Sequence, residues 1–150
     1  MGETRMFKHL LLPTDGSPLS KNGVRLGVAL ARELGARVTG LYVSPRFQVL
    51  TYRPNMLEEA RAEYERDAKI HADRHLAFIS MAAAESNVPC ETLSEIRDDV
   101  HQSIIDVARA RVCDLIVMAS HGRHGIAGML LGSETQRVLT HSNIPVLVCR

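Results

Sequence analysis

The sequence predicts a single α/β domain built on an open five-stranded parallel sheet that is doubly wound, with helices on both faces. Strand-like and helix-like segments alternate along all 150 residues, and this is the length of one ordinary domain. The runs Leu10–Leu12 and Leu115–Met118 are apolar without alternation, as expected of strands covered on both faces. Right-handed crossovers between parallel strands then place helices on both sides of the sheet.

Each element has local signals at its ends. The predicted strands cover residues 7–13, 37–43, 90–96, 113–119 and 144–149. The predicted helices run from Pro18 to about Leu34, from Leu57 to about Ala83, from a cap at Asp98 or Asp99 onward, and from Ser133 onward. Ser17 caps the first helix and Gly35 ends it. In that helix Gly23, Gly27 and Ala31 form a narrow stripe that lets it lie close to the sheet.

Composition excludes several classes of protein. Eighteen Lys and Arg balance 17 Asp and Glu without a long block of one sign, so neither nucleic acid nor an anionic membrane is an expected partner. No apolar run approaches the roughly 20 residues that cross a bilayer, and the first residues lack a signal peptide, so the cytoplasm is the expected location. The three cysteines lie far apart and are expected to be small buried residues rather than a metal or redox site.

The segment after the fourth strand carries the chemistry. Four glycines lie within the eleven residues from Gly122 to Gly132, and a helix begins directly afterwards. Glycine lets an anion approach main-chain N–H groups, and a helix N-terminus carries partial positive charge, so this combination is typical of a phosphate site. Ser133 and Thr135 offer hydroxyl donors, while His121, Arg123 and His124 offer positive charge. The alternative is a plain loop in which Ser133, with Gln136 in capping-box spacing, only caps a helix.

Standard nucleotide and catalytic signatures are absent from the sequence. There is no Gly-x4-Gly-Lys-Ser/Thr, and no Gly-x-Gly-x-x-Gly opens the first β–α unit. No serine lies in Gly-x-Ser-x-Gly, and His71 and His75, four apart on the long helix, have no third metal ligand. Nucleophilic hydrolysis and a zinc site therefore have no support.

The pattern Ala119-x2-Gly122-x9-Gly132-Ser133 resembles the ATP-binding branch of the universal stress protein family, whose motif is Gly-x2-Gly-x9-Gly-Ser/Thr. Residues 12–17 (Leu-Pro-Thr-Asp-Gly-Ser) and 144–148 (Ile-Pro-Val-Leu-Val) extend the resemblance to nearly the whole chain. It implies a Rossmann-like fold of the adenine nucleotide alpha hydrolase-like type, with strand order 3-2-1-4-5. Ala119 departs from the motif, since its methyl group stands where the family has glycine.

The resemblance also implies a site for ATP, carried by Mg²⁺. Pro13, Thr14, Asp15 and Val43 would line the adenine and ribose, with Met118 beside the base. Gly122, Gly132, Ser133 and Thr135 would hold the phosphates, and Ala119, Arg123 and Glu134 complete the set. Asp15 follows a central strand, where a carboxylate either accepts hydrogen bonds from the ligand or forms a turn.

The sequence leaves three functions open. The leading hypothesis is an ATP-binding regulatory or stress-response protein that hydrolyses ATP slowly or not at all, because no general base is evident. The others are an adenine-nucleotide hydrolase or transferase, and a nucleotide-free dimeric interaction module in which Ala119 marks lost binding. The closing strand, Ile144 to Cys149, is expected at a sheet edge, and in the resembling family such strands meet about a two-fold axis, so we expect a homodimer.

Overall fold

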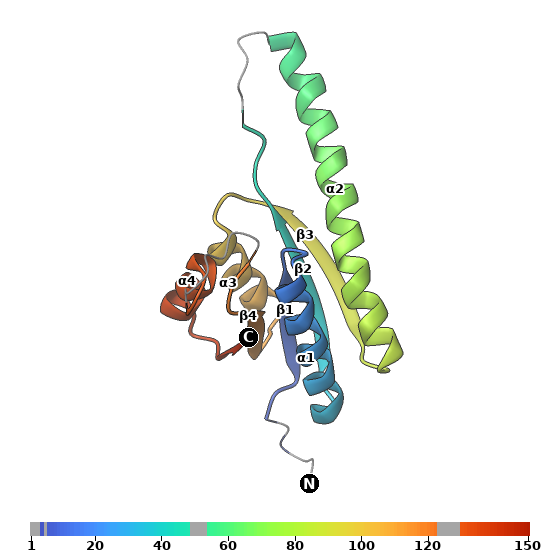
Figure 1. The fold of residues 1–150 in the computed structure, drawn as a ribbon, viewed down its shortest axis with the longest axis vertical. Coiled ribbons are helices and arrows are strands. Elements are labelled where there is room, and N and C mark those ends of the chain that lie inside the picture. The colour runs from blue at the N-terminus through green and yellow to red at the C-terminus, as the bar shows by residue number, and fades with distance from the viewer. Residues whose placement is uncertain (1–3, 5, 49–53, 123–129) are drawn as a thin grey trace.

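The computed structural model describes residue 4 and residues 6–48, 54–122 and 130–150; for residues 54–56 it describes the backbone. Within these ranges five strands alternate with four helices (Figure 1). The strands are β1 (His9–Thr14), β2 (Arg37–Ser44), β3 (Cys90–Ile96), β4 (Leu115–Ala119) and β5 (Val146–Cys149). The helices are α1 (Pro18–Leu34), α2 (Pro54–Glu85), α3 (Val100–Ala110) and α4 (Ser133–His141).

All strand pairs are parallel, and the strand order is β3-β2-β1-β4-β5. This confirms the predicted fold class and order. Registers such as His9 opposite Arg37 and Ile116 opposite Val146 bring the carboxyl ends of the strands to the same side of the sheet. The two apolar runs expected to be covered on both faces, Leu10–Leu12 in β1 and Leu115–Met118 in β4, are buried.

Each face of the sheet packs against two helices. On one face Leu10 and Leu12 of β1 pack with Val28 of α1 and Ile79 of α2. On the other face the intervening Leu11 packs against α3 and α4. Successive side chains of a strand point to opposite faces, so a strand sandwiched between two helix layers must be apolar throughout.

Several element ends differ from the prediction by a few residues. The long helix begins at Pro54 rather than Leu57, and the fourth and fifth strands begin two residues later than expected. The cap of α4 is a correction: its N-cap is Gly132, and Ser133 is the first helical residue, so no capping box forms. Gly132 takes this place because its N–H donates to the Ser120 carbonyl oxygen, 2.6 Å away, and its own carbonyl accepts the first helical N–H, that of Gln136.

The cysteines are free, and Cys113 and Cys149 are buried while Cys90 is half-buried. Burial raises the pKa of the Cys113 thiol to about 11, so the thiol stays protonated near neutral pH. None of the helices in the described ranges is long and apolar enough to span a membrane.

Candidate functional site

A cavity of about 480 Å³ lies at the carboxyl ends of β1, β2 and β4. The connection after β1 leads to α1 on one face, and the connection after β4 leads to α4 on the other, so the cavity lies at the switch point of the sheet. Its described lining residues are Pro13, Thr14, Asp15, Ser20, Leu41, Tyr42, Val43, Val100, Ile104, Met118, Ala119, His121, Gly122, Gly132, Ser133, Glu134 and Thr135. The structure thus brings together all the sequence-predicted site residues except Arg123, which lies outside the described ranges, as His124 does.

The turn after β1 is held by its own side chains. The Thr14 hydroxyl accepts the N–H of Gly16 at 3.1 Å and contacts the Ser20 hydroxyl at 3.0 Å. Asp15 Oδ1 accepts the N–H of Ser17 at 2.9 Å. Asp15 is therefore a turn former, and it also lines the cavity. The turn role expected from the sequence is observed, and the ligand-binding role stays a prediction.

The chain after β4 returns against this turn. A Cβ added at Gly122 would lie 2.5 Å from Asp15 Oδ2, so a side chain there would displace the carboxylate. A Cβ added at Gly132 would lie 3.3 Å from both Ser120 O and His121 Cα. Gly122 thus faces Asp15, and Gly132 lies beside the 120–122 backbone. The absence of side chains at these two positions lets the segments meet at the cavity wall.

The N-terminus of α4 faces the same cavity. The main-chain N–H groups of Ser133, Glu134 and Thr135 precede the first helical hydrogen bond, and among the described residues they find no acceptor. Three N–H donors at a helix N-terminus form a place for an anion. The Thr135 hydroxyl is already engaged, because it donates to the Ala119 carbonyl oxygen at 2.9 Å. What Thr135 offers a ligand is its main-chain N–H.

Glu134 is the second carboxylate of the cavity wall, and it is compensated by cationic and N–H partners. Its Oε2 accepts the main-chain N–H of His101 at 2.9 Å, and its Oε1 accepts from Arg137 at 3.0 Å. Glu134 therefore caps α3 from a different helix. The predicted side-chain cap from Asp98 or Asp99 is absent: Asp99 occupies the N-cap position without a side-chain hydrogen bond, and Asp98 Oδ1 accepts the N–H of Arg46 instead.

Another part of the cavity lining is apolar. Val43 and Met118, expected beside the nucleotide base, are joined there by Leu41, Val100 and Ile104. Ile104 belongs to the core of that face, and Val100 packs against it. Nothing in their spacing shows that part of this core is open to a cavity.

His121 stands at the start of the glycine-rich segment. Its Nδ1 lies 3.0 Å from the Ser120 hydroxyl, while its buried Nε2 has no hydrogen-bond partner among the described residues. The sequence had suggested His121 as a source of positive charge at the rim, and the structure places it in the cavity lining.

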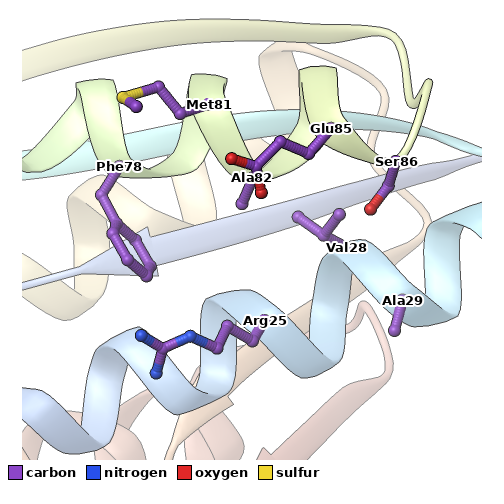
Figure 2. Close-up of a pocket in the computed structure, with 8 residues that line it drawn as sticks. All are labelled: Arg25, Val28, Ala29, Phe78, Met81, Ala82, Glu85 and Ser86. Atoms are coloured by element: carbon purple, nitrogen blue, oxygen red, sulfur yellow. The ribbon is translucent and has the colours of Figure 1, made fainter.

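A second hollow, of about 390 Å³, lies between α1 and α2. Figure 2 shows Phe78 and Ala82 of α2 opposite Arg25 and Val28 of α1 across it, and the Arg25 guanidinium lies 5.1 Å from the Phe78 ring centroid. It contains none of the predicted site residues. The first cavity remains the candidate site because it combines an apolar wall with a cluster of main-chain donors.

Comparison with known proteins decides the family. A sequence model described as "Universal stress protein family" matches residues 6–150. The chain belongs to the universal stress protein family. It is similar to the universal stress protein YxiE of Bacillus subtilis, with 31% identity over 153 residues, covering 97% of this chain and 100% of YxiE.

Solved structures agree with the universal stress protein fold. The MJ0577 protein of Methanocaldococcus jannaschii superposes with a TM-score of 0.79 at 24% identity, covering 95% of both chains. A universal stress protein in complex with cAMP superposes with a TM-score of 0.70 at 21% identity, covering 96% of this chain and 97% of that one. The Archaeoglobus fulgidus universal stress protein in complex with dAMP gives 0.62 at 18% identity, covering 97% and 99%.

Proposed function

We propose that this protein binds an adenine nucleotide, ATP with Mg²⁺ in its working state, in the cavity at the switch point, and acts as a regulatory protein of the cytoplasm. One observation carries the proposal: an apolar wall, a carboxylate and a helix N-terminus with open N–H donors enclose a single cavity of about 480 Å³. That volume is within the usual range for small-molecule sites, roughly 300–1,000 Å³.

The chemistry of the walls orients the ligand. The base fits between Val43 and Met118, where apolar side chains can cover its faces. The ribose hydroxyls fit beside Asp15, which can accept their hydrogen bonds. The phosphates fit at Gly122, Gly132 and the N-terminus of α4, because anions are favoured beside open N–H groups. Two relatives of the same fold hold adenine nucleotides, cAMP and dAMP, which supports the class of ligand.

Mg²⁺ fits this arrangement as a companion of the phosphates. No group of three or more His, Cys, Asp or Glu in the described ranges forms a metal cluster. Mg²⁺ commonly binds through substrate phosphates and few protein ligands, so it does not require such a cluster. When bound, it would neutralise part of the phosphate charge.

Binding rather than turnover is the proposed activity. Asp15 uses one carboxylate oxygen for Ser17 and lies against Gly122 with the other, and Glu134 is bonded to His101 and Arg137. Neither carboxylate is placed as a general base for an attacking water at the phosphate end. We therefore expect ATP hydrolysis to be slow or absent.

The test is calorimetric titration with ATP, ADP, AMP and cAMP in the presence of Mg²⁺, together with thermal shift. Gly122→Val places a side chain where the Asp15 carboxylate lies, so we expect affinity to fall about tenfold or more. Ala29→Leu is the matched control, because it fills the hollow between α1 and α2 instead. If Ala29→Leu abolished the heat of binding and Gly122→Val retained it, the nucleotide site would be the hollow between α1 and α2 instead. Wild-type protein that gives neither heat nor thermal shift would favour the nucleotide-free interaction module, and steady release of ADP would favour a hydrolase.

A further inference from the structure

The imidazole of His75 fills the space directly behind the turn that carries Asp15. Gly16, which follows Asp15, has φ +81°, and a Cβ added there would lie within 2.6 Å of three atoms of the His75 ring. The ring therefore lies flat against the main chain of the turn. Only glycine combines this backbone conformation with so close an approach.

The same ring also contacts the second strand. His75 stacks on Tyr42 of β2, with ring centroids 5.2 Å apart and planes inclined by 18°. Tyr42, like Asp15, lines the cavity. One side chain of α2 thus supports two neighbouring segments of the cavity wall from the helix layer of α1 and α2.

α2 holds His75 firmly. Ala72 and Leu76, on either side of it in sequence, are 1% and 5% exposed, and Ile79, one turn later, is fully buried. The N-terminal half of the same helix extends beyond the sheet (Figure 1). There the Tyr64 hydroxyl donates to the carbonyl oxygen of Pro45, just after β2. α2 is therefore a long element that is anchored at the site and projects away from it.

We propose that His75 is a positioning residue of the nucleotide site, and that through it the seating of α2 and nucleotide affinity are coupled. This inference rests on the proposed function. The ring sets the position of the Asp15–Gly16 turn and of Tyr42 relative to α2. It thereby sets the position of the Asp15 carboxylate in the cavity. Coupling between two sites is reciprocal, so a bound nucleotide steadies α2 to the same extent that a seated α2 favours the nucleotide.

The positioning role of His75 depends on the flat shape of its ring and not on the acid–base chemistry of the imidazole. A variant that keeps a flat ring therefore separates the two. Phenylalanine keeps a flat ring that can stack on Tyr42, whereas alanine leaves the turn unsupported. His71, one turn earlier on the same helix and exposed, is the matched control. We expect His75→Ala to weaken nucleotide binding roughly threefold to tenfold, while His75→Phe and His71→Ala stay within about twofold of wild type.

A double-mutant cycle tests the contact without nucleotide. Gly16→Ala suffers from both its positive φ and overlap with His75, and in the His75→Ala background only the backbone strain remains. Gly16→Ala should therefore lower the melting temperature of the apo protein less when His75 is already alanine. Equal losses in the two backgrounds would overturn the contact, and the proposal with it.

Hydrogen exchange of α2 supplies the reciprocal readout. Added ATP should slow exchange of the main-chain amides around residues 72–79 in the wild type, and this effect should shrink in His75→Ala and return in His75→Phe. If the wild type binds no adenine nucleotide, the proposed function and this inference both fail. If the wild type binds and His75→Ala binds equally well, with α2 protected alike, the inference alone fails.

Discussion

Val112 is a single residue whose backbone conformation conflicts with its side chain. It follows the C-cap of α3, Arg111, with φ 57°, and its side chain is 77% exposed. The N–H of Cys113 donates to Ala108 O at 2.8 Å, and this bond holds the turn in the left-handed region. α1 ends in the same way at Gly35, with φ 63°, where glycine avoids the strain.

Replacing Val112 with glycine should stabilise the protein. A β-branched residue in the left-handed region costs about 1–3 kcal/mol, while glycine loses about 0.5–1 kcal/mol more backbone entropy on folding. The strain is the larger quantity, so we expect Val112→Gly to raise the free energy of unfolding by about 1 kcal/mol in urea denaturation. Gly35→Val is the reverse substitution at the end of α1 and should lower the free energy of unfolding. A loss of stability in Val112→Gly would show that the turn carries little strain.

His9 is a buried imidazole at the start of β1, and the cavity lies at the other end of that strand. Its Nε2 lies 2.6 Å from the Thr39 hydroxyl, which itself donates to Glu91 at 3.0 Å, so the proton of the bond belongs to His9. Burial lowers the pKa of His9 below its usual 6.5, and the charge of Arg37 lowers it further, while the main chain of Arg111 and the charges of Glu91 and Asp114 act in the opposite direction.

This lowered pKa predicts how stability depends on pH. Below pH 6.5 the unfolded chain takes up a proton at His9 that the folded protein does not, so protons favour unfolding. The contribution of His9 is fully present above pH 6.5 and is lost as the pH falls toward the folded-state pKa. Urea denaturation between pH 7.5 and pH 5 should show the free energy of unfolding fall below about pH 6.5, and His9→Gln should reduce the slope of this fall. Identical slopes in the two proteins would contradict it.

At the scale of elements, the glycine stripe sets how closely α1 approaches the sheet. A Cβ added at Gly27 would overlap Cδ2 of the fully buried Leu12 and lie 3.2 Å from its Cδ1. A Cβ added at Gly23 would lie 3.4 Å from the N atom of Ala119, which is ordinary van der Waals contact. The two glycines look alike in the sequence, yet only Gly27 is required by packing.

Alanine at these two positions should therefore act in opposite directions. In a helix interior alanine is favoured over glycine by about 1 kcal/mol, whereas overpacking a core costs about 1–3 kcal/mol. We expect Gly27→Ala to lower the free energy of unfolding by about 1 kcal/mol and Gly23→Ala to leave it unchanged or raise it. Chemical denaturation of both variants decides this, and equal gains would mean that Leu12 moves aside freely.

The ends of α1 and α3 show which capping partners are close in sequence and which are not. The start and end of α1 were predicted because its signals are neighbours in sequence: the Ser17 hydroxyl accepts the N–H of Ser20 at 3.2 Å, and Gly35 supplies the left-handed turn. The N-terminus of α3 is satisfied by Glu134, 33 residues later than His101. No pattern around residues 98–101 could predict that partner, because it arrives only when α3 and α4 pack together.

For the whole molecule, the two edges of the sheet are β3 and β5. The predicted position of the closing strand at an edge is confirmed. Leu147 in the middle of β5 is 39% exposed, and the outer side of the strand leaves main-chain groups available for pairing. These observations support the proposal of a homodimer formed through Ile144 to Cys149 about a two-fold axis.

Sedimentation equilibrium at micromolar concentration tests this assembly. We expect the wild type to sediment as a dimer and Leu147→Lys as a monomer, since a lysine on an edge strand opposes pairing. Ile70→Lys is the control, because Ile70 is 57% exposed on α2, which packs on β2 and β3 and not on β5 at the other edge, so it should leave the dimer intact. A monomeric wild type would exclude the assembly.

The sequence by itself determined the order of elements, the central strands and most of the residues that line the candidate cavity. These depend on local signals: apolar runs, capping residues, glycines, and a motif whose spacing is fixed along the chain. Only the tertiary structure decided that Gly122 faces Asp15, that Glu134 caps α3, and that His75 supports Gly16 and Tyr42. Those contacts join residues that are far apart in sequence, and they depend on how the helices pack on the sheet, which no spacing along the chain encodes.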